Sequence, residues 1–131
     1  MSVEPRYDCA IDAAMSVIEG RWKTVIMCKL AHAGKPMRYN QLMNSINGIS
    51  PRIFTIQLKE MENDGIIFRN VISERPKIVE YSLTERGLSL LPILKDLAEW
   101  GLRNMFPNMV EFPNDMTVPD DSEIRKAVAA N

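Results

Sequence analysis

The segment Ser50–Gly65 contains the side chains whose types and spacing could do chemistry. At about 100° of rotation per helical residue, one face of this segment presents Arg52, Ile56, Lys59 and Asn63, with Thr55 beside them. Arginine and threonine can hydrogen-bond to base edges, lysine can neutralise phosphates, and an apolar side chain can contact a thymine methyl group. These residues, with Gln57 as a further hydrogen-bonding side chain, predict a helix that reads the major groove of double-stranded DNA. A merely solvated helix face is the alternative.

The charge of the chain is distributed unevenly. The 131 residues carry a formal net charge of −1 at pH 7, so bulk charge identifies no partner. Residues 20–86 nevertheless hold eleven Lys or Arg against six Asp or Glu, a net +5, whereas residues 1–19 and 87–131 each sum to −3. A basic centre between acidic ends favours contact between that centre and a polyanion, although uneven but solvated charge would give the same numbers.

The sequence lacks the motifs of the common catalytic and metal sites. His32 is the only histidine, and there is no Gly-rich phosphate loop, H-E-x-x-H, G-x-S-x-G or paired C-x-x-C motif. We therefore expect neither an enzyme nor a bound metal or cofactor. The start of the chain lacks an apolar core like that of a signal peptide, and no apolar run approaches membrane-spanning length. We accordingly expect a cytoplasmic protein without a membrane partner.

The two cysteines, Cys9 and Cys28, are expected to be free thiols in a reducing compartment. Cys9 lies near a predicted helix N-terminus, which favours the reactive thiolate form. The neighbouring carboxylates of Asp8 and Asp12 oppose that form. Cys9 is therefore either a redox switch or an unreactive thiol, whereas Cys28 falls on the core side of its helix and is expected to pack there.

The spacing of apolar residues predicts a definite order of helices and strands. In chain order the predicted helices are Cys9–Ile18, Trp22–Ala33, Tyr39–Ile46, Ser50–Asn63 and Thr84–Phe106. Gly34 is expected to end the second helix, and Ser50, Pro51 and Gly65 have the residue types of an N-cap, a first helical position and a helix end. Runs of β-branched and aromatic residues predict a hairpin of two strands, Ile66–Ser73 and Lys77–Leu83.

The last long helix and the residues after it are less regular. Pro92 is expected either to kink this helix or to split it in two. Residues 107–131 include three prolines and several acids, so we expect an irregular arm with a short final helix over Ser122–Ala130. The predicted organisation is a domain over residues 1–106 followed by this arm. Met109, Val110 and Phe112 could pack on a partner subunit.

Helix, helix, short helix, turn, amphipathic helix, hairpin and helix is the order of a winged helix-turn-helix domain. The predicted fold is thus mainly α with a small β-hairpin, in which Tyr39–Asn63 forms the helix-turn-helix and Ile66–Leu83 the wing. Arg75 and Lys77, on either side of Pro76, place positive charge at the wing tip, where phosphates would lie. Because winged helices also serve as protein-interaction modules, docking of the basic centre on an acidic protein is the alternative function.

Six groups of residues resemble the HxlR-type regulators, which are related in fold to the MarR regulators. They are Gly20-Arg21-Trp22-Lys23, Arg38-Tyr39-Asn40-Gln41-Leu42, Gly48-Ile49-Ser50, Leu58–Gly65, Val79–Glu85, and Leu91–Leu94 with Trp100-Gly101. The resemblance extends from Cys9 to Gly101 in one order without large gaps. It implies a bacterial or archaeal, homodimeric winged-helix transcription regulator that binds inverted repeats in promoters as a repressor or an activator.

The resemblance also implies roles for individual residues. Those at the family's DNA contacts are Ser50, Arg52, Thr55 and Lys59 in the recognition helix, Arg75 and Lys77 in the wing, and Arg38 at the start of the preceding helix, where it could meet a phosphate. Cys9 falls on an N-terminal cysteine that some members use to sense electrophiles, aldehydes or oxidants. Ala10 stands where proline usually follows that cysteine, which counts against thiol sensing. Ile56 stands where a polar residue is common, which implies a different operator sequence.

We therefore expect the helices Cys9–Ile18 and Thr84–Phe106 to pair across a two-fold axis. Such a dimer would present two recognition helices about one DNA turn, roughly 34 Å, apart. A small-molecule effector at the dimer seam, or chemistry at Cys9, would alter that spacing. Met15 and Met27 could line a pocket at this seam, and adaptable core packing is the alternative for both.

Overall fold

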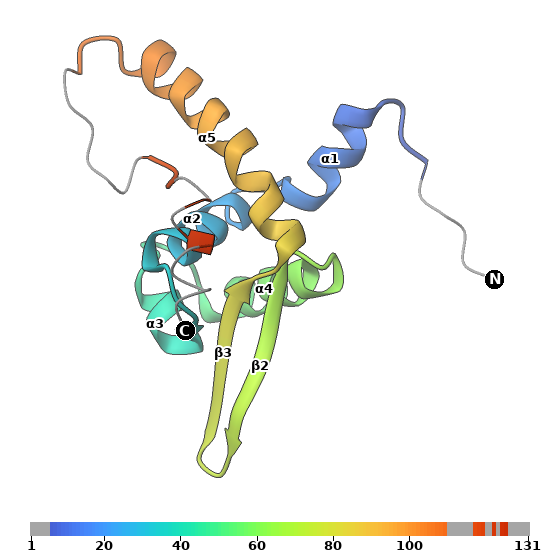
Figure 1. The fold of residues 1–131 in the computed structure, drawn as a ribbon, viewed down its shortest axis with the longest axis vertical. Helices are drawn as coiled ribbons and strands as arrows, with labels where there is room; N and C mark the ends of the chain where they lie inside the picture. The colour runs from blue at the N-terminus through green and yellow to red at the C-terminus, as the bar shows by residue number, and fades with distance from the viewer. Residues whose placement is uncertain (1–5, 110–116, 120–121, 123, 126–131) are drawn as a thin grey trace.

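The helices and strands follow the order of a winged helix-turn-helix domain (Figure 1). The computed structural model describes residues 6–109, 117–119, 122 and 124–125. Its helices are α1 (Ala10–Ile18), α2 (Lys23–Ala33), α3 (Tyr39–Asn44), α4 (Pro51–Asn63) and α5 (Glu85–Met105). Its strands are β1 (Met37–Arg38), β2 (Ile67–Glu74) and β3 (Lys77–Leu83). The prediction of a mainly α fold with a small β-hairpin is confirmed.

The ends of α2 and α4 are set by local sequence. The Ser50 hydroxyl oxygen accepts a hydrogen bond from the backbone N–H of Ile53 over 3.2 Å, and Pro51 occupies the first position, where a missing N–H costs nothing. Beyond α4 the chain turns through Gly65, whose φ is +74°, and α2 ends at Gly34 with a φ of +65°. Only glycine adopts such angles without strain, which confirms these predicted boundaries.

The sheet has one strand more than the predicted hairpin. The strand order is β1-β3-β2, and all neighbours are antiparallel. In β1, Met37 pairs with Tyr81 and Arg38 pairs with Glu80. A strand of two residues is too short to show alternation in the sequence, which is why it was not predicted. Glu74, predicted in the hairpin tip, instead pairs with Lys77 as the last rung of the ladder.

Helix α3 is shorter than predicted. It ends at Asn44 rather than at Ile46, because the next residues form tighter turns. The Ser45 hydroxyl donates to the Leu42 carbonyl over 2.6 Å, and the Ile46 N–H bonds to the Met43 carbonyl over 3.1 Å, three residues back. Ile46 is still buried, so the apolar spacing correctly identified its side of the chain but not the helix end.

The core lies where α2, α3, α4 and the start of α5 meet the sheet (Figure 1). Its fully buried large side chains are Phe54, Ile26, Met27, Leu42, Met61, Ile66, Ile67 and Leu91. Gly87 allows α5 to approach this core closely, because a Cβ atom there would lie 2.3 Å from the Ile66 carbonyl oxygen. Helix α5 is continuous through Pro92, so of the two alternatives the split into two helices is excluded.

Part of the expected C-terminal arm packs on the same core. Val118 and Ile124 are 6% and 8% exposed and belong to the hydrophobic cluster. Arg125 forms an ion pair with Glu85 at the start of α5, and His32 Nε2 lies 2.6 Å from the carbonyl oxygen of Thr117. Val110, Phe112 and residues 126–131 lie outside the described residues. In the described part of the chain, no helix combines the length and apolarity needed to cross a membrane.

Candidate nucleic-acid interface

Helix α4 separates a buried face from an exposed one, as its sequence predicts. Phe54, Leu58 and Met61 are at most 3% exposed and point into the core. The exposed residues include the predicted DNA contacts Arg52, Thr55, Ile56 and Lys59. Ile56 is 41% exposed, and Ile53, one helical turn before it, is 40% exposed. The outward surface of α4 therefore combines cationic, hydroxyl and apolar groups.

Thr55 is held by two short hydrogen bonds. Its hydroxyl donates to the Pro51 carbonyl oxygen over 2.9 Å, and its Oγ1 lies 2.7 Å from the Tyr39 hydroxyl. The Tyr39 ring in turn packs against Phe54, with ring centroids 5.0 Å apart. The sequence placed Tyr39 in the helix before the turn and in the family resemblance, but did not show it as a neighbour of Thr55. No sequence signal joins residues 39 and 55, because the contact depends on how α3 packs on α4.

Gln57 lies apart from the other expected DNA contacts. It is half-buried, and its side-chain oxygen has neither solvent contact nor a hydrogen-bond partner within the described residues. On a helix with about 100° per residue, Gln57 lies about 140° from Arg52, which explains its place on the flank of α4. The structure brings Gln57 to the edge of the core rather than to the exposed face.

An ion pair between a buried lysine and an exposed glutamate joins α4 to α2. Lys23 Nζ lies 2.8 Å from Glu60 Oε2, and the side chains are 7% and 48% exposed. A buried ammonium group needs such a partner, because desolvation of an unpaired charge is costly. In the sequence Lys23 is one of the basic residues of the central segment, and no local pattern shows its role in positioning α4.

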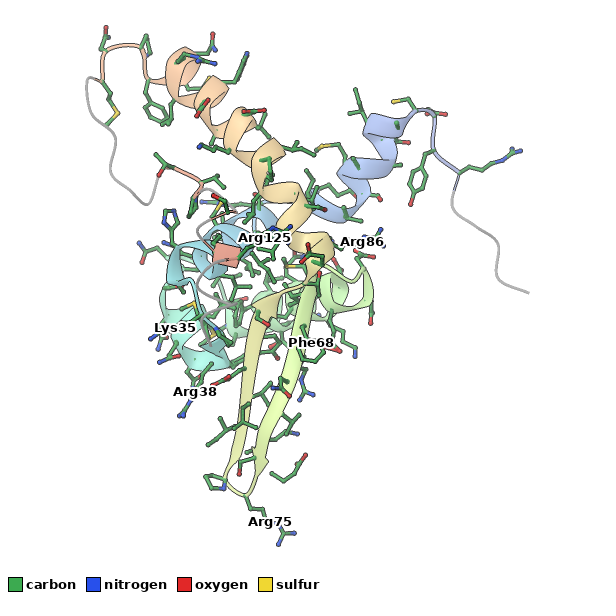
Figure 2. All side chains as sticks on the ribbon, viewed as in Figure 1. Lys35, Arg38, Phe68, Arg75, Arg86 and Arg125 are labelled. Atoms are coloured by element: carbon green, nitrogen blue, oxygen red, sulfur yellow. The ribbon has the colours of Figure 1, made fainter. Side chains whose placement is uncertain are left out.

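The remaining basic residues expected at DNA lie at the edges of the helix-turn-helix. Arg75 and Lys77 are exposed at the tip of the hairpin, and Arg38 is exposed where β1 meets α3. Figure 2 shows Arg38 and Arg75 on the side of the molecule opposite to the free end of α5. Ser50 is also exposed, and its oxygen is engaged as the α4 cap.

Two further helices, α5 and α1, expose apolar side chains. Ile93, Leu97 and Trp100 follow one face of α5 at spacings of four and three, and each is more than 55% exposed. On α1, Ile11 is 74% exposed and Met15 is 44% exposed. Trp100 is thus not a core residue of the single chain. Apolar side chains at helical spacing and in solvent are typical of an interaction surface.

The two cysteines have contrasting surroundings. Cys9 is exposed at the N-terminus of α1. Cys28 is half-buried against the core, and this burial raises the pKa of its thiol, an effect that Lys29 partly opposes. The expected packing role of Cys28 is confirmed. Met27 is fully buried and acts as core packing, whereas Met15 is exposed.

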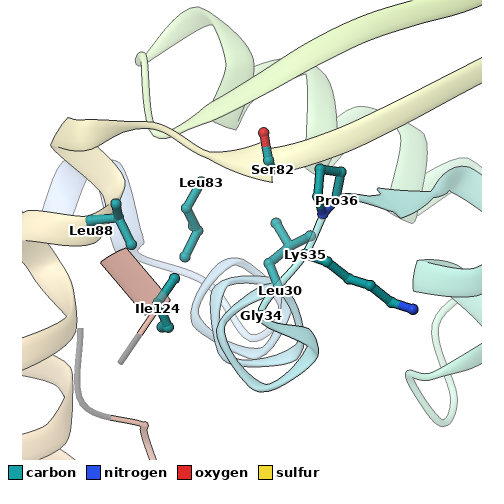
Figure 3. A pocket seen from close by; sticks show the side chains of 8 residues that line it. All are labelled: Leu30, Gly34, Lys35, Pro36, Ser82, Leu83, Leu88 and Ile124. Atoms are coloured by element: carbon teal, nitrogen blue, oxygen red, sulfur yellow. The ribbon is translucent and has the colours of Figure 1, made fainter. Parts of the chain in front are cut away.

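A small apolar cavity of about 230 Å³ lies between α2, β3 and α5. It is lined by Leu30, Gly34, Lys35, Pro36, Ser82, Leu83, Leu88 and Ile124. Figure 3 shows Leu83, Leu88 and Ile124 gathered on one side, whereas the Lys35 side chain extends away from them. The cavity is smaller than a typical ligand site and offers a mainly hydrophobic wall.

Comparisons with known proteins agree with this geometry. Residues 17–109 match the family model of the HxlR-like helix-turn-helix. An HTH-type transcriptional regulator from Methanothermobacter thermautotrophicus is 41% identical over 98 residues, which cover 75% of this chain and 73% of the relative. The family match extends through the helix-turn-helix, the wing and α5.

Solved structures give the same result. The redox regulator HypR in its oxidised form superposes with a TM-score of 0.66 and 38% identity, covering 73% of this chain and 97% of HypR. The reduced form of the transcriptional regulator YodB from B. subtilis superposes with a TM-score of 0.67 and 29% identity, covering 79% of this chain and all of YodB. With its matching sequence, element order and exposed recognition helix, the chain belongs to the HxlR-like helix-turn-helix family and is a transcriptional regulator of the helix-turn-helix type.

Proposed function

We propose that the protein is a homodimer that binds an inverted-repeat DNA operator and thereby represses or activates transcription. The observation that carries this proposal is the outward face of α4, where Arg52, Thr55, Ile56 and Lys59 are exposed while the opposite face is buried. A helix of this composition fits the major groove, in which Arg52 and Thr55 reach base edges and Ile56 contacts a thymine methyl group.

Phosphate contacts supply most of the affinity in this proposal. Lys59 on α4, Arg38 beside α3, and Arg75 and Lys77 on the wing are exposed cations at separate points around the helix-turn-helix. Each cation that neutralises a phosphate releases counterions, so binding should weaken steeply as salt rises. The Ser50 hydroxyl, whose oxygen caps α4, still has a hydrogen to donate to a phosphate.

The apolar surface of α1 and α5 supports the dimer. Ile93, Leu97 and Trp100 on α5, with Ile11 on α1, would leave solvent when the same surface of a second copy packs on them. At about 25 cal/mol per Å² of apolar surface, burial of such large side chains on both subunits is a substantial driving force. The pairing would fix the distance between the two α4 helices.

Regulation is proposed to act on that distance. Cys9 is exposed at the start of α1, next to the proposed dimer surface, so that a covalent change at its thiol would disturb the pairing. The redox character named for HypR supports Cys9 as the modified residue. A small apolar effector in the cavity between β3 and α5 is the second route, because it would contact both the wing and the dimer helix.

The test of DNA binding is footprinting of DNA upstream of the protein's own gene and its neighbours, at two salt concentrations. Protection of an inverted repeat with half-sites about one helical turn apart, weakening as salt rises, is expected. Diffuse protection without sequence preference, or none, would contradict the proposal.

The test of regulation compares the release of DNA by diamide or an aldehyde for the unmodified protein, Cys9→Ala and Cys28→Ala. Release should be lost in Cys9→Ala and retained in Cys28→Ala, because the Cys28 thiol is shielded. Unchanged release from Cys9→Ala would exclude thiol sensing at Cys9.

A further inference from the structure

The hydroxyl of Thr55 is the most constrained polar group on the outward face of α4. It makes two contacts at hydrogen-bond distance, 2.9 Å to the Pro51 carbonyl oxygen and 2.7 Å to the Tyr39 hydroxyl. A threonine hydroxyl has one hydrogen to donate and two lone pairs that accept. A carbonyl oxygen can only accept, so the contact to Pro51 uses the single Thr55 hydrogen.

This assignment fixes the direction of the other bond. With its hydrogen on Pro51, Thr55 can only accept from Tyr39, and the Tyr39 hydroxyl must donate. The reverse arrangement would leave two oxygen atoms 2.9 Å apart with no hydrogen between them, which is unfavourable. One lone pair of Thr55 Oγ1 then remains for an external partner.

The Tyr39 hydroxyl is held in place by the packing of its ring. The ring lies against the fully buried Phe54, with centroids 5.0 Å apart and an interplanar angle of 59°. Phe54 points into the core from the same helix that carries Thr55. The donor on α3 and the acceptor on α4 are therefore held in one arrangement before DNA arrives.

We propose that the Pro51 carbonyl and Tyr39 together make Thr55 a pure hydrogen-bond acceptor, so that this position of the recognition helix selects a base bearing an exocyclic amino group. The inference rests on the proposed DNA-binding function and specifies the chemistry of its ligand. In the major groove the amino donors are N6 of adenine and N4 of cytosine, whereas guanine O6 and thymine O4 only accept. Thr55 therefore contacts adenine or cytosine and repels an acceptor at the same place.

The neighbouring side chain of Ile56 selects adenine over cytosine. Ile56 is 41% exposed and lies about 100° round the helix from Thr55, whereas Ile53 lies about 160° from Thr55. Ile56 cannot hydrogen-bond and provides apolar surface for a thymine methyl group, which an A·T pair presents beside the adenine amino group. The acceptor of Thr55 and the apolar side chain of Ile56 together match an A·T pair.

The test uses the full-length protein and its footprinted operator, with single base analogues that remove one group at a time. Purine in place of adenine removes the amino group, 2-pyrimidinone in place of cytosine does the same, and uracil in place of thymine removes the methyl group. At one position per half-site, loss of the amino group should weaken binding roughly threefold to tenfold, the range of a single hydrogen bond.

Three variants assign that effect to the proposed residues. Thr55→Val keeps the shape and removes the acceptor, so it should bind the natural operator more weakly and no longer distinguish the amino-lacking analogue. Thr55→Ser keeps the hydroxyl and should retain the discrimination. Tyr39→Phe keeps the ring and removes one of the two hydrogen bonds that hold the Thr55 hydroxyl, so it should reduce the discrimination while leaving the salt dependence of binding unchanged.

Several results would overturn the inference. If Thr55→Val discriminated against the amino-lacking analogue as the natural protein does, Thr55 would not be the acceptor, although operator binding would stand. A preference for guanine or thymine as the base at the position sensitive to Thr55 would show that the hydroxyl donates. Absence of any specific footprint for the natural protein would instead overturn the proposed function, and the inference with it.

Discussion

The two ends of the molecule differ in how far their apolar side chains are buried. In the region from α2 to β3, Leu42 and Phe54 are fully buried, and the exposed side chains on α4 include cations. Along α1 and the second half of α5, Ile11 and Leu97 are 74% and 57% exposed. Figure 1 shows α1 and α5 extending away from the core, on the side opposite to the hairpin tip. The first region has a closed core, although Phe68 and Ile72 on β2 are exposed. The second region exposes apolar side chains that a second copy would cover in the proposed dimer.

This difference indicates that the two regions have different roles. A region with a closed core and a charged exterior can hold side chains at fixed positions, which direct readout of bases requires. A helix that exposes large apolar residues to solvent is further stabilised when another surface packs on it. Substitutions in the core of the region from α2 to β3 should therefore lower the stability of the fold. Substitutions on α1 or the second half of α5 should instead weaken the association of subunits.

The largest effect is expected from Leu97→Glu on α5. In the proposed dimer, the new carboxylates of both subunits would be desolvated at the interface, so the protein should become monomeric while its helical content is retained. Loss of the second half-site contact removes avidity, which is worth roughly 10²- to 10⁴-fold in linked binding, and operator affinity should fall at least 100-fold. Sedimentation velocity and fluorescence anisotropy measure the two quantities.

The matched control is Glu99→Lys, which changes charge on α5 about 160° round the helix from Leu97. Glu99 is exposed, and this variant should remain dimeric. A dimeric Leu97→Glu protein would show that the subunits pair through some other surface.

Two glycines of α5 sharpen the comparison within one helix. Alanine in place of Gly87 would have its Cβ 2.3 Å from the Ile66 carbonyl oxygen. A Cβ at position 101 would have no described atom within 4 Å. Gly87→Ala should destabilise the fold by about 2–3 kcal/mol through overpacking. Gly101→Ala should raise its stability by about 0.5–1 kcal/mol, the difference in helix propensity. Urea unfolding measures both, and equal changes would show that the core half of α5 is no tighter than its free half.

Gly87 also shows where sequence reasoning stops. Ser50, Pro51 and Gly65 mark the ends of α4 through bonds within a few residues, and such local rules predicted the helix correctly. Gly87 looks like any helical glycine in the sequence, because its tight contact comes from Ile66, which follows α4. The elements were thus predictable from local chemistry, and the distances between them were not.

The same limit applied to the candidate site. Arg52, Ile56 and Lys59 could be placed on the exposed face of α4 from helical spacing alone. The ion pair and the hydrogen bond that hold this helix in place come from other elements, namely from Lys23 on α2 and from Tyr39 on α3. Pairing across elements depends on packing and therefore left no periodic signal in the sequence.

A moderate effect is expected from Glu60→Gln. This change leaves the Lys23 ammonium group, whose side chain is 7% exposed, without its counter-charge. The free energy of unfolding should fall by about 1–2 kcal/mol, the range for a hydrogen bond to a charged group when half of the pair is exposed. Urea unfolding with two spectroscopic probes measures this loss.

The matched control for the Lys23–Glu60 pair is Glu62→Gln, also on α4. Glu62 pairs with the exposed Lys59 over 3.7 Å, and its loss should cost less than about 0.5 kcal/mol. If both variants lost the same stability, the Lys23–Glu60 pair would contribute no more than a surface contact, and apolar packing alone would position α4.

The smallest effect is expected from Lys77→Ala at the wing tip. Lys77 is exposed, so the fold should keep its stability, and one lost phosphate contact should lower the slope of log affinity against log salt by about one. Because a phosphate contact carries no sequence information, affinity should fall equally for the operator and for its point variants. Arg52→Ala, by contrast, should reduce the discrimination between them. If neither variant changed DNA binding in this way, and Lys77→Ala instead weakened binding to an acidic protein, the basic surface would serve the alternative role of protein docking.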